Sequence, residues 1–383
     1  MCASRAVYAL AISGLILVAD ASPYDPHVPG AQPWFEGWYT RVIAVDSAVS
    51  FGTVAGLFPS QALAKPAYFA GIIVGNVTSR NTQVYQQLPP SITATASGGR
   101  PVHEQPTALA PPDFSLEAAD FSYNLTVSND DFRLSAYAAG VTLTLVGNAP
   151  NVPWGPGGET PEGALAYLPF ADLHWYVYSL ATPVTWTFHN PEASPQTLTG
   201  QGYAHMEKNW GRTFPEKWVW AQGMRMSRRC SSASVSEGPE VMFALAGGPA
   251  PLSRPWLVRA ASALPMAWLV AYHSQNIKWN FRPYDPTVFR VHSDACHGLF
   301  QLNATRFLQS VVITIDADSD SFGDVACPTS SGFSNESMHS FAAEAHIQAY
   351  RYRLWPLRLL GWELVETQVI PNVALEFGGT FRC

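Results

Sequence analysis

One short stretch of this sequence sets charged and amide side chains among tryptophans: residues 203–222, which read YAHMEKNWGRTFPEKWVWAQ. Only 13% of the whole chain is charged, so a Glu-Lys-Asn run directly before Trp210 is unusual. Side chains alternate between the two faces of a β-strand. We therefore expect Glu207 and Asn209 on one face of a strand, and Lys208 and Trp210 on the other.

The second part of this stretch supplies aromatic surface that could face Glu207. Phe214 and Pro215 predict a turn, and three side chains then share one face of the next strand: Trp218, Trp220 and Gln222. A carboxyl group in a dry aromatic cavity has a raised pKa and can stay protonated near neutral pH, which makes Glu207 a candidate general acid. The alternative is that Glu207 pairs with Lys208 or Arg212 and that the tryptophans fill a core.

A second acidic residue stands among aromatic residues near the N-terminus, in the segment WFEGWY at residues 34–39. Alternation places Glu36 and Trp38 on one face, and Gly37 and Tyr39 on the other. Glu36 is therefore a second candidate acid. The alternative is a solvated glutamate at the edge of a sheet.

Other polar groups give weaker signals. Asp172 and His174, beside a tryptophan, form a third polar spot, for which a loop carboxylate and an exposed histidine are the simpler interpretation. Two histidine pairs lack the spacing of metal ligands and are expected on the surface: His292 with His297, and His339 with His346. The sequence contains no HExxH, paired CxxC, GxSxG or phosphate-binding glycine motif. We predict neither a metal nor a cofactor.

Strand-like runs, rich in β-branched and aromatic residues, dominate the chain, at 38–45, 50–57, 67–77, 121–127, 132–138, 141–146, 164–170, 173–180, 184–188, 241–246, 267–272, 277–281, 298–304, 307–316, 345–353 and 364–377. Loops are expected at 98–112, 147–163, 247–254 and 316–335. No long window has helical periodicity. The pattern predicts an all-β protein of two antiparallel barrels or sandwiches, at residues 22–195 and 196–383.

The N-terminus and the cysteines indicate export. Residues 1–21 combine one early positive charge, an apolar run and small residues, which is the pattern of a signal peptide, and no later segment is long enough to span a bilayer. For the four remaining cysteines we expect Cys296–Cys327 and Cys230–Cys383 disulfides, with buried free thiols as the alternative. Four glycosylation sequons agree with secretion: Asn76, Asn124, Asn303 and Asn335. We expect a secreted glycoprotein, with a retained N-terminal membrane anchor as the alternative.

Charge and composition narrow the choice of partner. A net charge of -7 and the lack of a dense basic cluster argue against nucleic acid. The chain contains 13 tryptophans, which fit either a large β core or a pocket for a hydrophobic ligand.

The residues discussed above resemble the tocopherol cyclase family. The similarity rests on Phe35-Glu36-Gly37-Trp38-Tyr39, on Glu207-Lys208-Asn209-Trp210-Gly211, and on Phe214-Pro215 with Trp218, Trp220 and Gln222. A weaker echo lies at residues 374–379, ALEFGG, so the resemblance extends over almost the whole mature chain. Plant members of the family carry plastid-targeting segments, whereas this chain begins with a secretory pattern.

The resemblance implies two lipocalin-like β-barrel halves and a cofactor-independent ring closure of a hydrophobic prenylated quinol or polyene to a chromanol-type product. We expect Glu207 as proton donor, Asn209 and Lys208 as its orienting partners, and Glu36 as the second acid. The expected substrate-binding residues are Trp38, Tyr39, Asp172, Trp210, Phe214, Trp218, Trp220 and Gln222. A non-catalytic carrier of lipids or pigments and a structural glycoprotein are the alternatives.

Overall fold

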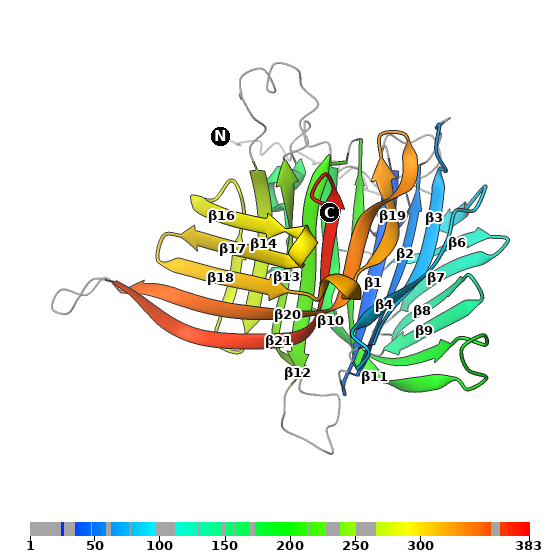
Figure 1. The fold of residues 1–383 in the computed structure, drawn as a ribbon, viewed down its shortest axis with the longest axis horizontal. Coiled ribbons are helices and arrows are strands. Elements are labelled where there is room, and N and C mark those ends of the chain that lie inside the picture. The colour runs from blue at the N-terminus through cyan, green and yellow to red at the C-terminus, as the bar shows by residue number, and fades with distance from the viewer. Residues whose placement is uncertain are drawn as a thin grey trace, which may run out of the picture.

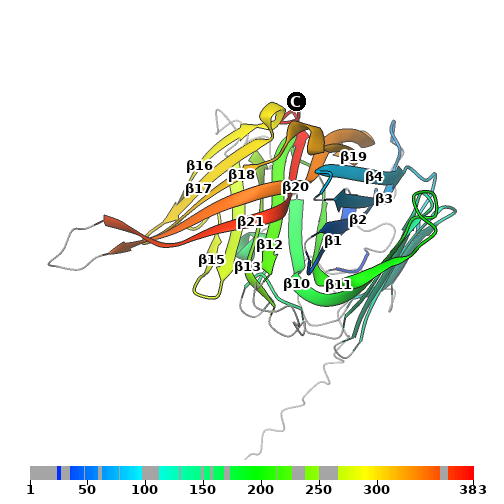
Figure 2. The same cartoon turned by 60° about the horizontal axis from the view of Figure 1, so that its bottom comes forward.

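The computed structural model describes residues 24–26, 35–46, 48–58, 63–76, 78–96, 112–128, 131–147, 151–155, 158–167, 173–212, 214–226, 238–249, 266–353 and 361–383. These residues form two large antiparallel sheets that lie side by side (Figures 1 and 2). The helices within the described residues are short 3-10 turns: η2 (Gly163–Tyr167), η4 (Ala295–His297) and η5 (Ser319–Ser321). The predicted all-β fold with few helices is confirmed.

The first sheet contains eleven strands in the order β4-β3-β2-β1-β11-β10-β9-β8-β7-β6-β5. Their bounds are β1 (Phe35–Ala44), β2 (Val49–Leu57), β3 (Tyr68–Asn76), β4 (Asn81–Gln87), β5 (Thr93–Ala96), β6 (Asp113–Ala118), β7 (Phe121–Ser128), β8 (Asp131–Ala138), β9 (Val141–Gly147), β10 (Leu173–His189) and β11 (Leu198–Gly211). The two motifs singled out in the sequence are neighbours here, because β1 and β11 pair with Tyr39 opposite Glu207.

The second sheet has the order β15-β14-β13-β12-β21-β20-β18-β17-β16, with β19 paired to β20. Its strands are β12 (Lys217–Met226), β13 (Pro239–Pro249), β14 (Met266–Ser274), β15 (Lys278–Phe281), β16 (Thr287–Asp294), β17 (Leu299–Arg306), β18 (Gln309–Asp316), β19 (Gly323–Thr329), β20 (Gly332–Arg353) and β21 (Gly361–Gly379). The chain passes from the first sheet to the second between β11 and β12. The domain boundary expected near residue 195 falls before β11, although β11 still pairs within the first sheet.

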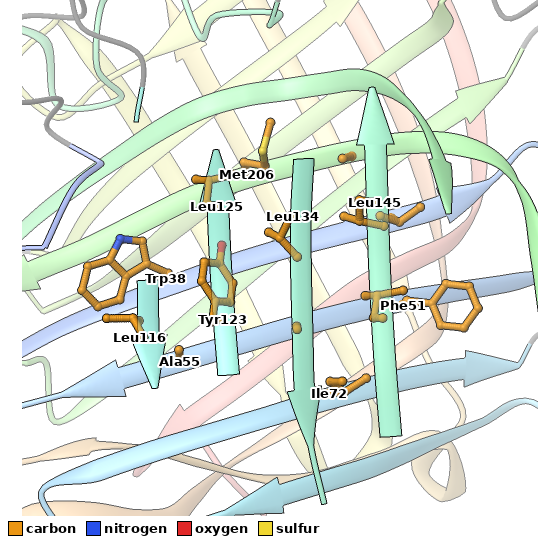
Figure 3. Close-up of a cluster of buried hydrophobic side chains, with 14 of the residues drawn as sticks. Trp38, Phe51, Ala55, Ile72, Leu116, Tyr123, Leu125, Leu134, Leu145 and Met206 are labelled. Atoms are coloured by element: carbon orange, nitrogen blue, oxygen red, sulfur yellow. The ribbon is translucent and has the colours of Figure 1, made fainter. Parts of the chain in front are cut away.

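Three large groups of buried side chains stabilise the sheets, besides a small fourth one. Inward-facing residues of β6 to β9, among them Leu116, Leu125, Leu134 and Leu145, form the core of the first sheet together with Trp38 and Met206 (Figure 3). Buried hydrophobic side chains of the second sheet form a second core. A third group joins the two sheets and contains Phe35, Tyr39, Trp175, Trp218, Trp220, Phe333 and Phe341. The strands that meet there are consequently buried on both faces.

Most predicted strands are present, and the differences have local causes. Residues 164–170 were expected to be a strand, but Gly163–Tyr167 form the 3-10 turn η2, which begins at a glycine with φ +53°. The expected loop at 316–335 contains β19, because Gly323–Thr329 pair with β20. Ala139 and Gly140 form the hairpin turn between β8 and β9, with φ values of +49° and +82°. Positive φ at both central residues is the signature of a type I′ turn.

One disulfide is present among the described residues, between Cys296 and Cys383. The expected pairing of Cys296 with Cys327 is therefore wrong, as is that of Cys230 with Cys383. Cys327 is a buried free thiol on β19, whose pairing with β20 places it between the sheets. Burial raises the pKa of this thiol to about 12, so it stays protonated at neutral pH. Cys230 lies outside the described residues.

The disulfide ties the C-terminal residue to the connection between β16 and β17. Its two cysteines are 87 residues apart in sequence. Closing a loop of this length restricts the unfolded chain, so the Cys383→Ser variant should lose about 2–4 kcal/mol of unfolding free energy in urea titrations. A reductant should lower the unfolding midpoint of the wild type and of the control variant Cys327→Ala, but not that of Cys383→Ser. Equal midpoints for wild type and Cys383→Ser would contradict this assignment.

Candidate functional site

A cavity of about 310 Å³ lies between the two sheets. Aromatic side chains from both sheets make up much of its wall: Phe35, Tyr39, Phe69, Trp175, Phe214, Trp218, Trp220 and Phe333. Ligand pockets commonly measure about 300–1,000 Å³, so this cavity is near the lower end of the range. Its size and lining suit a compact hydrophobic molecule.

Glu207 enters this cavity from β11 and is only 3% exposed. Its Oε2 atom lies 2.8 Å from Nε2 of His205. The same oxygen accepts a hydrogen bond of 3.1 Å from Nε1 of Trp220, which belongs to the other sheet. Neither Lys208 nor Arg212 contacts Glu207 within the described residues, so the alternative pairing considered from the sequence is not found.

The two carboxylate oxygens of Glu207 have different surroundings. Both His205 and Trp220 contact Oε2, whereas no partner for Oε1 is found within the part of the chain that the structure describes. Oε1 is therefore the oxygen that a molecule in the cavity can reach. His205 is fully buried behind the carboxyl group, and its Nδ1 atom has no partner among the described residues.

The other face of β1 and β11 carries a buried ion pair. Nζ of Lys208 lies 3.4 Å from a carboxylate oxygen of Glu36, donates to the backbone oxygen of Asp25, and lies over the rings of Trp38 and Trp210 at 4.8 and 5.2 Å. Burial lowers the pKa of Lys208, and Glu36 opposes that shift. Since both charges are fully buried, the pair neutralises charge inside the first sheet.

A buried arginine joins the sheets next to the cavity. Arg41 donates to Oε1 of Gln222 at 2.8 Å, to the backbone oxygen of Gln222 at 3.1 Å and to the backbone oxygen of Asn372. Its guanidinium also lies 4.7 Å from the ring centroid of Phe341. Burial lowers the pKa of Arg41 to about 10, and the charge survives at neutral pH. Gln222 thus holds Arg41 and does not line the cavity.

Two further glutamates line the cavity, and neither was expected there from the sequence. Glu376 on β21 has one oxygen 3.1 Å from Nε2 of His339, and its other oxygen accepts a hydrogen bond of 2.6 Å from Nε1 of Trp218. Glu162 lies 3.1 Å from Nδ1 of His174 and accepts a hydrogen bond from the backbone N–H of Trp175. The expectation that His339 lies on the surface is wrong, because it is only 6% exposed.

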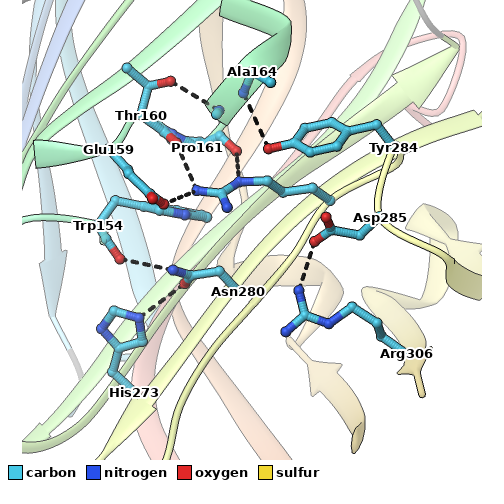
Figure 4. Close-up of polar contacts among 12 residues, drawn as sticks. Trp154, Glu159, Thr160, Pro161, Ala164, His273, Asn280, Tyr284, Asp285 and Arg306 are labelled. Carbon is cyan, nitrogen blue, oxygen red and sulfur yellow. Dashed lines mark hydrogen bonds and ion pairs between the residues drawn. The ribbon is translucent and has the colours of Figure 1, made fainter. Parts of the chain in front are cut away.

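The loop that carries Glu162 belongs to the first half of the chain but is held by the second sheet (Figure 4). Arg282 donates to the backbone oxygens of Thr160 and Pro161 at 3.1 and 2.9 Å, and its guanidinium is 2.9 Å from the carboxylate of Glu159. Asn280 donates to the backbone oxygen of Trp154 at 3.2 Å. These bonds hold the loop, from which Glu162 and Leu165 line the cavity.

The structure brings most of the expected site residues together. The cavity is lined by Trp38, Tyr39, Glu207, Asn209, Phe214, Trp218 and Trp220. It is not lined by Glu36, Lys208, Trp210 or Gln222. Asp172 lies outside the described residues, and the histidine expected beside it, His174, pairs with Glu162 and stacks on Trp210 at 5.2 Å.

No group of three or more possible metal ligands occurs among the described residues. Their helices include none that is long and apolar enough to cross a membrane.

The buried Lys208–Glu36 pair should stabilise the folded protein. Replacing Lys208 by Met removes the ammonium group from a buried carboxylate and should lower the unfolding free energy by about 3–5 kcal/mol. The double variant Glu36→Gln/Lys208→Met should recover part of that loss, because no unpaired charge remains. Urea unfolding of the three proteins measures both effects. A double variant less stable than the single variant would contradict the assignment.

Comparison with known proteins identifies relatives of the whole chain. The tocopherol cyclase-like family matches residues 32–379. No curated protein matches the sequence. Among solved structures, CghA has 11% sequence identity and a TM-score of 0.55, with 90% of this chain and 87% of CghA covered.

Two other solved structures share the fold. CghA with Sch210972 gives 10% identity and a TM-score of 0.56, covering 93% of this chain and 95% of CghA. A putative AttH from Nitrosomonas europaea gives 13% identity and a TM-score of 0.50, covering 94% and 99%. The family match supports an enzyme of the cyclase type without fixing its substrate. Because the match extends over nearly the full length, this chain belongs to the tocopherol cyclase-like family.

Proposed function

We propose that the protein closes a ring on a hydrophobic prenylated quinol or polyene by acid catalysis, with Glu207 as the proton donor and a chromanol-type product. The observation that carries the proposal is the position of Glu207: a buried carboxyl group, backed by a histidine, in an aromatic cavity between two sheets. Membership of the tocopherol cyclase-like family supports the reaction type.

The chemistry needs one proton to enter and one to leave. Glu207 gives its proton to the less substituted carbon of a trisubstituted alkene, and the electron pair of the double bond forms the new C–H bond. The neighbouring carbon becomes a tertiary cation. The phenol oxygen then forms the C–O bond and loses its proton, so the reaction is an isomerisation without a redox step.

The surroundings of Glu207 favour this proton transfer. Because Trp220 and His205 both address Oε2, the transferable proton belongs on Oε1, the oxygen within reach of a ligand. When that proton leaves, the indole N–H and the imidazole stabilise the carboxylate that remains. Asn209 lines the same cavity, and we assign to it the orientation of the substrate.

The aromatic wall suits the cation that forms. Aromatic faces attract a positive charge by about 0.5–2 kcal/mol each, and the rings of Trp175, Trp218 and Trp220 line the cavity. The small volume favours a short prenyl chain or a compact polyene. A prenylhydroquinone, with a single dimethylallyl group, is a suitable test substrate.

We also propose that the protein works in the secretory route, as expected from residues 1–21. The Cys296–Cys383 disulfide supports an oxidising compartment. Two of the sequon asparagines, Asn76 and Asn335, are exposed and open to glycosylation.

The Glu207→Gln variant tests the reaction. It keeps the shape of the side chain and its hydrogen-bond acceptor but has no acidic proton, so turnover of prenylhydroquinone to chromanol should fall by about 10²–10⁴-fold. Binding of the substrate, measured by tryptophan fluorescence, should change little. Mass spectrometry of the product gives the rate, and Glu344→Gln at an exposed position is the matched control. Equal turnover by Glu207→Gln and the wild type would rule out this acid.

The same experiment separates an enzyme from a carrier. If the wild-type protein binds prenylhydroquinone and similar compounds but returns each of them unchanged, the cavity serves as a carrier site. Product formation by the wild type excludes that alternative.

A further inference from the structure

The contacts around Glu207 recur around Glu376. Trp218 and Trp220 stand on the same face of β12, and each donates its indole N–H to a different glutamate. Each glutamate also lies within 3.1 Å of Nε2 of a histidine: Glu207 near His205 at 2.8 Å, and Glu376 near His339 at 3.1 Å. One carboxylate–histidine pair comes from each sheet, and both glutamates line the same cavity.

The two glutamates differ in how their oxygens are engaged. Glu207 receives both contacts on Oε2, which leaves Oε1 to carry a proton. Glu376 accepts a hydrogen bond from Trp218 on Oε1, and its Oε2 lies 3.1 Å from Nε2 of His339. Each oxygen of Glu376 therefore has a protein neighbour, whereas Glu207 has both of its neighbours on one oxygen. The geometry therefore assigns opposite duties to the two groups.

Tyr39 lines the same cavity as both glutamates. Burial raises the pKa of the Tyr39 hydroxyl, Arg41 opposes the shift, and Glu207 and Glu376 both add to it. The Tyr39 phenol therefore lies in a part of the cavity that is near both carboxyl groups.

Resting on the proposed function, we propose that Glu376, positioned by His339 and Trp218, is the base that takes up the phenolic proton as the ring closes. Attack of the phenol oxygen on the tertiary cation forms the C–O bond and makes that oxygen strongly acidic. Its O–H bond then breaks, and the proton passes to a carboxylate oxygen of Glu376, each of which has a second lone pair. The proton that left Glu207 is matched by the one that Glu376 receives.

Glu207 and Glu376 thus assist the first and the last proton transfer of the reaction. Without a base at Glu376, the cation still forms at Glu207 but is captured less efficiently. It then returns to the alkene by losing a proton from a neighbouring carbon. In D₂O this reversal leaves deuterium in the recovered substrate, which gives a readout of protonation separate from product formation.

The test compares Glu376→Gln and Glu207→Gln with the wild type, using prenylhydroquinone in D₂O and mass spectrometry of both substrate and product. We expect Glu376→Gln to form product about 10²-fold more slowly while recovered substrate gains deuterium. Glu207→Gln should show neither product nor label. Glu376→Asp, which keeps a carboxylate, should recover part of the rate, and His339→Gln should lower the rate less than Glu376→Gln.

Each outcome has a distinct meaning. Product formation by Glu376→Gln at the wild-type rate overturns the base assignment and leaves the proposed function intact. Loss of both product and label in a folded Glu376→Gln protein also overturns it, because the residue would then be needed for protonation. Wild-type turnover by Glu207→Gln instead contradicts the proposed function itself. Thermal unfolding of every variant shows whether the fold is kept.

Discussion

Burial of β1, β11, β12 and the C-terminal half of β21 on both faces is the constraint on which this structure depends. Alternate residues of these strands belong to the core of their own sheet, and the others meet the opposite sheet. In β11 this alternation sends Lys208 and Trp210 to the first core, and Glu207 and Asn209 to the cavity. One short run of residues therefore serves stability with one set of side chains and the site with the other.

Close approach of the sheets requires small residues at the contact. A Cβ atom added to Gly56 would lie 2.6 Å from the ring of Phe333, and one added to Gly75 would lie 2.4 Å from Cβ of Phe341. These glycines of the first sheet receive large aromatic side chains from β20 of the second sheet. The sheets can thus interlock while the rings of β12 still reach the glutamates. Polar groups buried by this approach need partners, and Arg41 obtains three of its hydrogen bonds from the opposite sheet.

The alternation of side chains along a strand was enough to predict which residues of the two motifs share a face. It could not identify the residues that these side chains contact. Glu36 and Lys208 are far apart in sequence, and only the pairing of β1 with β11 brings them together. Likewise, the β-pattern indicated two halves without showing that a cavity lies between them. Long-range pairing and the packing of one sheet on another leave no mark at short spacing.

The histidines of β20 show why the burial of a single residue can be missed when only the sequence is known. A register shift between Ser340 and Ala343 changes the alternation, and both His339 and His346 project from the face opposite the sheet's own core. The first sheet covers that face at His339, whereas at His346 it is exposed to solvent. The spacing of seven residues between His339 and His346 was evidence against a metal site. It gave no information about whether the first sheet covers either histidine. The signal available was the ALEFGG segment, whose glutamate pairs with His339.

The lining of the cavity also bears on whether water could capture the cation of the proposed reaction. A water molecule needs about two to four polar partners to be held in place. Oε1 of Glu376 and Oε2 of Glu207 already accept hydrogen bonds from Trp218 and Trp220, and most of the cavity lining is apolar. In the proposed substrate the phenol is tethered to the cation, and well-oriented intramolecular groups react as if present at about 10⁵–10⁸ M. Under the proposed function, capture of the cation by the substrate's own oxygen is therefore favoured over capture by water.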